Sequence, residues 1–208
     1  IKKLEKKGAL NINLVTPTHF VNSILRALDI YMPSIPIVYN SSGYECVDTL
    51  KRLKGYIDVY LMDFKYIDPY KAEQYSNAPN YPQICKQSLQ EAYSQQEKCA
   101  FSSDGIMQNG VIVRHLLMPR ATNDAIAVFD WVRNNMPNSY FSLMSQYIPL
   151  YKAQNIPTIN RKITQREYDK VTNYIVESEF ENCYFQELSS ANTNYIPDFN
   201  FTGIQPDI

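Results

Sequence analysis

The stretch NINLVTPTHF runs from Asn11 to Phe20. Its apolar, strand-like part ends abruptly at four polar or rigid residues, Thr16-Pro17-Thr18-His19. Proline has no backbone N–H and suits the first turn of a helix, so the segment predicts a strand that passes directly into a helix. Residues 18–31 then carry apolar side chains at spacings of three and four, which is typical of an amphipathic helix. The stop at residues 16–19 fits two interpretations, helix capping by Thr16 or the rim of an active site.

Five more short apolar runs follow along the chain and alternate with helical patterns. The runs are 35–40, 57–64, 110–118, 139–147 and 182–188, and the helical patterns are 44–53, 122–135 and 164–178. Two further helices are expected in the irregular segment 66–109, one starting near Asp68-Pro69 and one near Asn80-Tyr81-Pro82. The alternation predicts βαβ units and a mostly parallel sheet, and the near-continuous apolar runs predict strands covered on both faces.

We therefore expect an α/β fold with five parallel strands in chain order and helices on the outer face. Residues 1–188 should form one domain, and residues 189–208 a loosely ordered tail. A family resemblance described below implies that the strand at 11–16 lies at an open edge of the sheet, since its natural neighbour is missing. An open edge can pair with another chain, so a dimer through this strand is expected.

The composition excludes several classes of protein. The 208 residues carry a net charge of -1, and the 20% charged residues mix both signs, which gives no field for nucleic acid or a membrane surface. No apolar run approaches the ~20 residues that span a bilayer. The four cysteines, Cys46, Cys85, Cys99 and Cys183, form no CxxC pair. This usage is typical of reduced cysteines in a cytoplasmic protein, and we expect no metal ligands among them.

Polar side chains follow five of the apolar runs. They are Thr16-Pro17-Thr18-His19, Asn40-Ser41-Ser42-Gly43, Asp63 with Lys65, Arg114 with His115, and Gln146 with Tyr147. In parallel α/β folds ligands bind beyond the carboxyl ends of the strands, so these groups predict a site at one edge of the sheet. Taken singly, they are also typical of a helix cap, a turn and a surface ion pair.

Arg114 and His115 interrupt the apolar run VIVRHLL. Adjacent side chains in a strand face opposite sides, so one of the two must point into the barrel or cleft. A buried arginine there needs an anion or a carboxylate, which favours a functional role for one member of the pair.

The residues alone leave three hypotheses open. Lys65 at a strand end suits a Schiff base, as in an aldolase. His19, Asp63 and His115 suit a divalent metal in a barrel mouth. The third hypothesis is a polar rim that binds a large organic cofactor with charged and hydroxylated parts.

Longer motifs give a resemblance to a known family. They are NINLVTPTHF, PIVYNSSGYE, DVYLMDFKY, VIVRHLLMPR and SLMSQYIP, in this order. From Gly8 to Phe199 the chain resembles radical S-adenosylmethionine (SAM) proteins, and within them an uncharacterised branch of pyruvate formate-lyase activating enzyme homologues. The resemblance implies a partial (β/α)6 TIM-like barrel and a [4Fe–4S] cluster that cleaves SAM to a 5′-deoxyadenosyl radical. It implies an oxidoreductase whose partner is a glycyl-radical enzyme or another protein substrate.

The family holds its cluster in a CxxxCxxC loop after the first barrel strand, and this sequence has no such loop. The strand at 11–16 resembles the family's second strand. We therefore expect a fragment whose first β/α unit, with the cluster ligands, lies upstream of Ile1. Such a fragment is expected to have no cofactor bound and to be inactive alone.

The resemblance also implies which residues contact SAM. Thr16-Pro17-Thr18 stands where the family has a Gly-Gly-Glu turn at the SAM ammonium, Asn40-Ser41-Ser42 matches an Asp-Thr-Asn-Gly turn, and Asp63 with Lys65 matches a Leu-Asp-Leu-Lys strand end. Arg114 is expected to bind the SAM carboxylate. Tyr147, where activating enzymes have a His, is expected to stack on the adenine. The rival interpretations are a Schiff-base lyase that uses Lys65, and a non-catalytic fragment that binds a protein partner.

Overall fold

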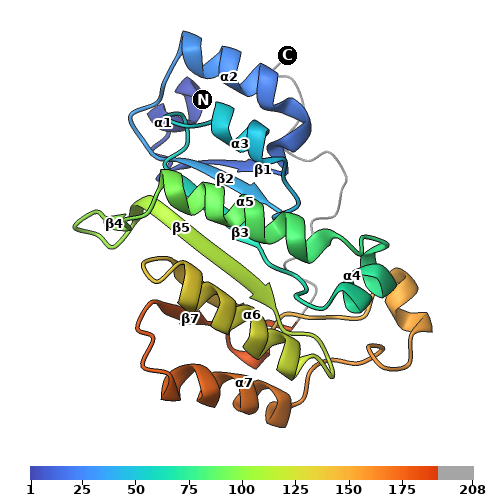
Figure 1. The fold of residues 1–208 in the computed structure, drawn as a ribbon. Coiled ribbons are helices and arrows are strands. Elements are labelled where there is room, and N and C mark those ends of the chain that lie inside the picture. Colours follow the sequence, from blue (N-terminus) through green and yellow to red (C-terminus); the bar gives the residue numbers. More distant parts are fainter. Residues whose placement is uncertain (192–208) are drawn as a thin grey trace.

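The computed structural model describes residues 1–191, and its centre is a twisted parallel sheet (Figure 1). The parallel strands are β1 (Ile12–Val15), β2 (Ile37–Ser41), β3 (Val59–Asp63), β5 (Met107–Leu116), β6 (Tyr140–Met144) and β7 (Cys183–Phe185). They lie side by side in the order β1-β2-β3-β5-β6-β7, which is the order of the chain. The expected parallel α/β fold is confirmed. The expected number of five strands is wrong, because the run at 182–188 also joins the sheet and pairs with β6.

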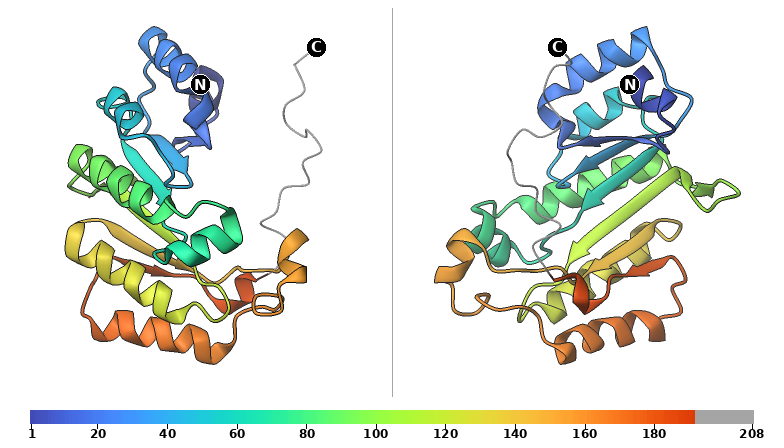
Figure 2. Two further views of the ribbon diagram at one scale, coloured as in Figure 1. Left: turned by 45° about the vertical axis from the view of Figure 1, so that its right-hand side comes forward. Right: turned by 180° about the vertical axis from the view of Figure 1, so that it is seen from behind.

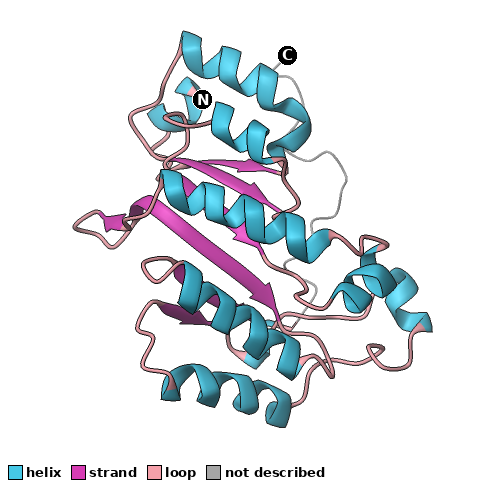
Figure 3. Cartoon of the chain, viewed as in Figure 1, coloured by secondary structure: helices cyan, strands magenta, loops and turns pink. Residues whose placement is uncertain are grey.

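Helices occupy the segments where the sequence predicts them, and the short helices η2 (Tyr151–Asn155) and η3 (Leu188–Ser190) were not predicted. They are α1 (Lys2–Lys6), η1 (Pro17–Phe20), α2 (Val21–Ile30), α3 (Val47–Arg52), α4 (Pro69–Ser76), α5 (Tyr81–Gln95), α6 (Thr122–Asn135), η2 (Tyr151–Asn155), α7 (Gln165–Glu177) and η3 (Leu188–Ser190). The two helices expected within 66–109 are confirmed as α4 and α5, with Asp68 and Asn80 as their N-cap residues. Helix and strand segments form separate layers (Figure 3).

Helices α2, α3, α5, α6 and α7 cover one face of the sheet (Figure 2). Cover on both faces was expected from the apolar strands. Within residues 1–191, however, the opposite face carries no such layer of helices. We call this second face the open face. β1 lies at the edge of the sheet in this part of the chain, as expected, and its pairing with a second chain stays a prediction. The tail expected at 189–208 falls outside the described residues from residue 192 on.

One short strand was missed. β4 (Ala100–Phe101) pairs antiparallel with the start of β5 and forms a hairpin that projects from the sheet (Figure 1). Two residues are too few to give a periodic pattern, so the sequence carried no signal for it.

Strand alternation decides which side chains reach the open face. Tyr39, Tyr60 and Phe141 point to the helices and are fully buried. Their chain neighbours Asn40 and Leu61 lie on the opposite face, where the register pairs them directly. The two faces therefore differ in chemistry, with an apolar core beneath the helices and polar groups at the carboxyl ends of the open face.

The turn after β2 makes a close approach to β3 that only glycine permits. Gly43 has φ +77°, and a Cβ added there would lie 2.2 Å from the carbonyl oxygen of Asp63 and 2.8 Å from Cys85 Sγ. Gly55 also has a positive φ, +85°, but nothing lies within 4 Å of its added Cβ. A side chain at Gly55 would add only the strain of a positive φ, whereas a side chain at Gly43 would add that strain and a steric clash.

We expect Gly43→Ala to destabilise the fold more than Gly55→Ala. The second change costs about 1–2 kcal/mol for the left-handed conformation. The first adds a clash with backbone, which should cost about 1–3 kcal/mol more. Urea unfolding of both variants measures the difference, and equal free energies of unfolding would contradict the close approach.

Candidate functional site

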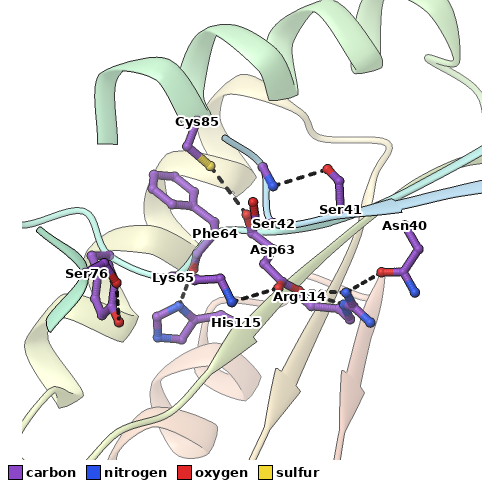
Figure 4. Close-up of polar contacts among 12 residues, drawn as sticks. Asn40, Ser41, Ser42, Asp63, Phe64, Lys65, Ser76, Cys85, Arg114 and His115 are labelled. Carbon is purple, nitrogen blue, oxygen red and sulfur yellow. Dashed lines mark hydrogen bonds and ion pairs between the residues drawn. The ribbon is translucent and has the colours of Figure 1, made fainter. Parts of the chain in front are cut away.

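Four of the predicted site residues meet at the carboxyl ends of neighbouring strands on the open face (Figure 4). Arg114, on β5, donates from Nε to Asp63 Oδ1 at 2.8 Å and from Nη2 to Asn40 Oδ1 at 2.6 Å. Lys65 Nζ lies 3.1 Å from the other carboxylate oxygen of Asp63. The side chains of β2, β3 and β5 are thus joined into one network, which we call the Arg114 network (Asn40, Asp63, Lys65 and Arg114).

The Arg114 network places two cations beside one carboxylate. Its formal charge is therefore positive, and an anion could approach the part of Arg114 that Asp63 and Asn40 leave free. Nη1 of Arg114 has no hydrogen-bond or ion-pair partner among residues 1–191. Lys65 is 42% exposed at its side chain and Asp63 only 17%, so the cationic groups are the more accessible ones.

The backbone that carries this network is held by hydrogen bonds at consecutive groups. The N–H of Phe64 donates to the carbonyl of Arg114 at 2.8 Å. On the helix side of the sheet, His115 Nδ1 lies 2.7 Å from the carbonyl oxygen of Phe64. A carbonyl oxygen only accepts, so Nδ1 carries the proton and Nε2 is the bare nitrogen, buried and without a partner among the described residues.

Arg114 and His115 face opposite sides, as strand geometry predicted. His115 packs under the helices, with its ring stacked on Phe141 at 6.4 Å between centroids. The hypothesis that His19, Asp63 and His115 bind one metal is wrong, because His19 is exposed on η1 and His115 faces away from Asp63. Residues 1–191 contain no group of three His, Cys, Asp or Glu side chains that could hold a metal ion.

The stop in the first strand comes from the backbone of Thr16. Thr16 has φ +51°, and its N–H donates to the carbonyl of Asn40 at 2.8 Å. Pro17, which is buried, then opens η1. The capping interpretation of Thr16 is wrong in its side-chain part, because its hydroxyl makes no capping bond to η1. A β-branched residue in the left-handed region costs about 1–2 kcal/mol, and such strain concentrates at functional sites.

Thr18 does not reach the Arg114 network. Its hydroxyl donates to Glu45 Oε1 at 2.7 Å, and the hydroxyl of Tyr39 donates to Glu45 Oε2 at 3.1 Å. Glu45 is only 2% exposed, so these two hydroxyls satisfy a buried carboxylate. The bonds tie η1 to β2 and leave Thr18 Oγ1 little freedom to bind an ammonium. A carboxylate in this role was missed, although the motif PIVYNSSGYE contains it.

Ser41 is the last residue of β2 and Ser42 follows it, and the two differ in exposure. Ser41 is buried, and its Oγ accepts from the N–H of Gly43 at 3.2 Å. Ser42 is exposed, and its carbonyl accepts from the hydroxyl of Tyr81 at 2.9 Å. The turn expected over Asn40–Gly43 is shorter than the composition suggested, because Asn40 and Ser41 still belong to β2 and the chain bends at Gly43.

Tyr147 lies apart from the network. It is buried, burial raises the pKa of its phenol, and its hydroxyl donates to the carbonyl of Ile159 at 3.0 Å. The structure therefore brings together Asn40, Asp63, Lys65 and Arg114, with the Thr16 backbone adjacent, and leaves Thr18 and Tyr147 outside this cluster.

The cysteines of the described residues do not fit an iron–sulfur cluster. Cys46 is exposed on one side of the turn after β2, whereas Cys85 is buried in α5. Burial raises the pKa of the Cys85 thiol to about 12 and that of Cys183 to about 11, which disfavours the thiolate that a metal needs. We therefore assign no cluster ligand within residues 1–191.

Comparisons with known proteins show the fold. The chain superposes on a domain of a pyruvate-formate lyase-activating enzyme from Bacteroides vulgatus with a TM-score of 0.55 and 9% identity, over 82% of this chain and 91% of that one. It superposes on Streptococcus suis SuiB bound to S-adenosylmethionine with a TM-score of 0.59 and 15% identity, over 91% of this chain and 43% of that one. At these identities the likeness shows a shared α/β fold. The fold that the resemblance implied is thereby confirmed.

A different protein, a curated relative, is similar to the chain in sequence. The uncharacterized protein MJ0674 of Methanocaldococcus jannaschii is 35% identical over 173 residues, which are 82% of this chain and 47% of that protein. The chain thus spans about half the length of this relative. No protein-family model matches the chain. Among residues 1–191, no helix combines the length and the apolar character needed to cross a membrane.

The buried histidine gives the fold a predictable pH dependence. Burial lowers the pKa of His115 below its ordinary value of 6.5, against the opposing effects of the Phe64 carbonyl, Asp124 and Asp63 and with a smaller contribution from Lys71. Below about pH 6.5 the His115 imidazole is protonated in the unfolded chain but stays neutral in the folded chain. The free energy of unfolding therefore falls by up to about 1.4 kcal/mol per pH unit below that point.

We expect His115→Asn to remove this loss between about pH 6.5 and 5.5, even if the variant is less stable throughout. Urea unfolding at several pH values measures the slope. His19→Asn, at an exposed position, is the matched control and should keep the wild-type slope. The same slope in wild type and His115→Asn would contradict a buried neutral His115.

Proposed function

We propose that the chain is part of a radical SAM protein, and that the Arg114 network binds the amino-acid end of S-adenosylmethionine. The observation that carries the proposal is the position of Arg114, which joins three strand ends on the open face of the sheet. The carboxyl edge is where parallel α/β folds bind ligands. The likeness in fold to SuiB, a protein whose structure holds S-adenosylmethionine, supports the same ligand class.

The charges of the network suit one end of SAM. SAM carries a carboxylate, an ammonium and a sulfonium. Nη1 of Arg114, which has no partner within residues 1–191, and the ammonium of Lys65 would bind the carboxylate. Their positive charge would repel the two cationic groups of the ligand, which would point away from them. Asp63 would hold both cations in place, and Asn40 would fix the plane of the guanidinium through its bond to Nη2. The ammonium would then need acceptors nearby, such as backbone carbonyls at the Thr16 turn.

The activity we propose for the whole protein is reductive cleavage of SAM to a 5′-deoxyadenosyl radical. That chemistry requires a [4Fe–4S] cluster, for which residues 1–191 supply no ligands. This chain would therefore contribute the binding and orientation of SAM and no electron transfer. The partner we propose is a protein or peptide substrate, such as a glycyl-radical enzyme. SuiB, which shares the fold, has been crystallised with its precursor peptide SuiA.

The rival Schiff-base chemistry has weaker support. A Schiff-base lysine needs an unprotonated amine in an apolar pocket. Lys65 is instead 42% exposed at its side chain, and its Nζ lies 3.1 Å from Asp63 Oδ2. The pattern of contacts thus suits electrostatic binding by Lys65.

We expect Arg114→Ala to weaken SAM binding by about 1.5–3 kcal/mol, the usual contribution of a hydrogen bond to a charged group. That is about one to two decades in affinity. An NMR-detected titration of the 208-residue chain with SAM measures affinities in the weak range expected without a cluster. Arg133→Ala is the matched control, because Arg133 also pairs with an aspartate, Asp130, but on the outer helix α6.

Arg133→Ala should bind SAM as the wild type does. Equal affinities of wild type and Arg114→Ala would remove Arg114 from the site and leave it as a structural charge on β5. Absence of any SAM-dependent shift near Asn40, Asp63 and Lys65 in the wild-type chain would contradict the proposed function itself.

A further inference from the structure

Tyr81 joins the segments that directly follow β2 and β3, the strands that carry Asn40 and Asp63, although it belongs to neither segment. It is the first residue of α5 and is 4% exposed. Its hydroxyl oxygen lies 2.9 Å from the carbonyl oxygen of Ser42 and 3.0 Å from that of Asp63. The same oxygen accepts from the N–H of Lys65 at 2.9 Å. One phenol therefore contacts the turn after β2 and both ends of the Asp63–Lys65 segment.

Two other α5 side chains reinforce these contacts. Cys85 Sγ lies 3.5 Å from the carbonyl oxygen of Asp63, and Ser88 Oγ donates to the carbonyl of Gly43 at 2.6 Å. Gly43 has no Cβ and so lets the turn approach Asp63. Helix α5 thus fastens the loops after β2 and β3 to each other from the side opposite the open face.

The chemistry of a buried phenol suits this role. Burial raises the pKa of Tyr81 far above its ordinary value, so the hydroxyl keeps its proton at any working pH. That proton can be shared between the two carbonyls, and the lone pairs accept from Lys65. A phenylalanine would keep the ring contacts with Tyr44 and Tyr66 and would remove the hydrogen bonds alone.

We propose that Tyr81 is a positioning residue for the ligand site: it sets the distance from the Asp63–Lys65 backbone to Ser42, which directly follows the end of β2 that carries Asn40. Tyr81 does not touch the ligand. Without its hydroxyl, the Lys65 and Asp63 side chains would lose their fixed relation to Asn40 and Arg114. This inference rests on the proposed function for its ligand, SAM, but its structural part can be measured without one.

The test compares Tyr81→Phe with Tyr60→Phe. Tyr60 is an equally suitable tyrosine for the control, because it is fully buried on β3 and its hydroxyl donates to Gln95 Oε1 at 2.7 Å, outside the Arg114 network. Two quantities are measured for each variant of the 208-residue chain: hydrogen exchange of the Lys65 amide, and affinity for SAM by NMR titration. Urea unfolding reports global stability, so that local effects can be separated from it.

In Tyr81→Phe we expect the Lys65 amide to exchange at least about tenfold faster than in Tyr60→Phe at matched global stability. We expect SAM affinity to fall about three- to tenfold, the effect of losing one net hydrogen bond, while Tyr60→Phe keeps wild-type affinity. If Tyr81→Phe fails to fold, Ser88→Ala removes the contact to Gly43 from the same helix and should lower SAM affinity in the same direction.

Three results would overturn the inference. The first is Lys65 exchange in Tyr81→Phe that matches Tyr60→Phe. The second is faster exchange with unchanged SAM affinity, which leaves Tyr81 a purely structural role. The third is an equal loss of affinity in both variants. A wild-type chain that binds no SAM overturns the proposed function instead, and Lys65 exchange still decides whether Tyr81 fixes this backbone.

Discussion

The alternation of Arg114 and His115 along β5 is the constraint on which the site depends. Because adjacent side chains in a strand point to opposite faces, one residue pair serves two environments. Arg114 joins Asp63 and Asn40 on the open face, while His115 donates to the Phe64 carbonyl under the helices. Arg114 and His115 thus contact consecutive residues, Asp63 at the end of β3 and Phe64 directly after it. A shift of β5 by one residue would exchange the two side chains and would bury a guanidinium among aromatic rings.

The strand ends could be predicted from the sequence because they depend on local patterns. The polar residues that follow the apolar runs marked the carboxyl ends of the strands. Because parallel strands end at the same edge of a sheet, a common site could be predicted for four residues, Asn40, Asp63, Lys65 and Arg114. Proline at 17 and at 69 marked two helix starts correctly. The sixth parallel strand was visible as a run but was not counted, and the hairpin strand β4 was too short to give a pattern.

The hydrogen-bond partners of several expected site residues could not be predicted, because they join residues that lie far apart in the sequence. Thr18 was expected at an ammonium and instead bonds to Glu45, 27 residues away. Tyr147 was expected on an adenine and instead donates to the carbonyl of Ile159. Tyr81 was seen only as part of a helix start. In each case the residue type was informative about hydrogen-bonding capacity, but the partner is decided by packing of elements that no local pattern encodes.

The position of Asp63 between two cations decides what kind of binding site this edge can be. A guanidinium without a carboxylate would attract any anion and would move to meet it. Asp63 reduces the net positive charge of the cluster. Its two carboxylate oxygens also hold Arg114 and Lys65 in place in the absence of a ligand. Preorganisation of this kind lowers the entropy lost on binding and favours ligands of matching geometry over ligands of matching charge. The geometry is then only as good as the backbone beneath Asp63 and Lys65. That backbone is held from the core side by His115 and by the phenol of Tyr81, so in the proposed site the selectivity would depend on residues that the ligand does not contact.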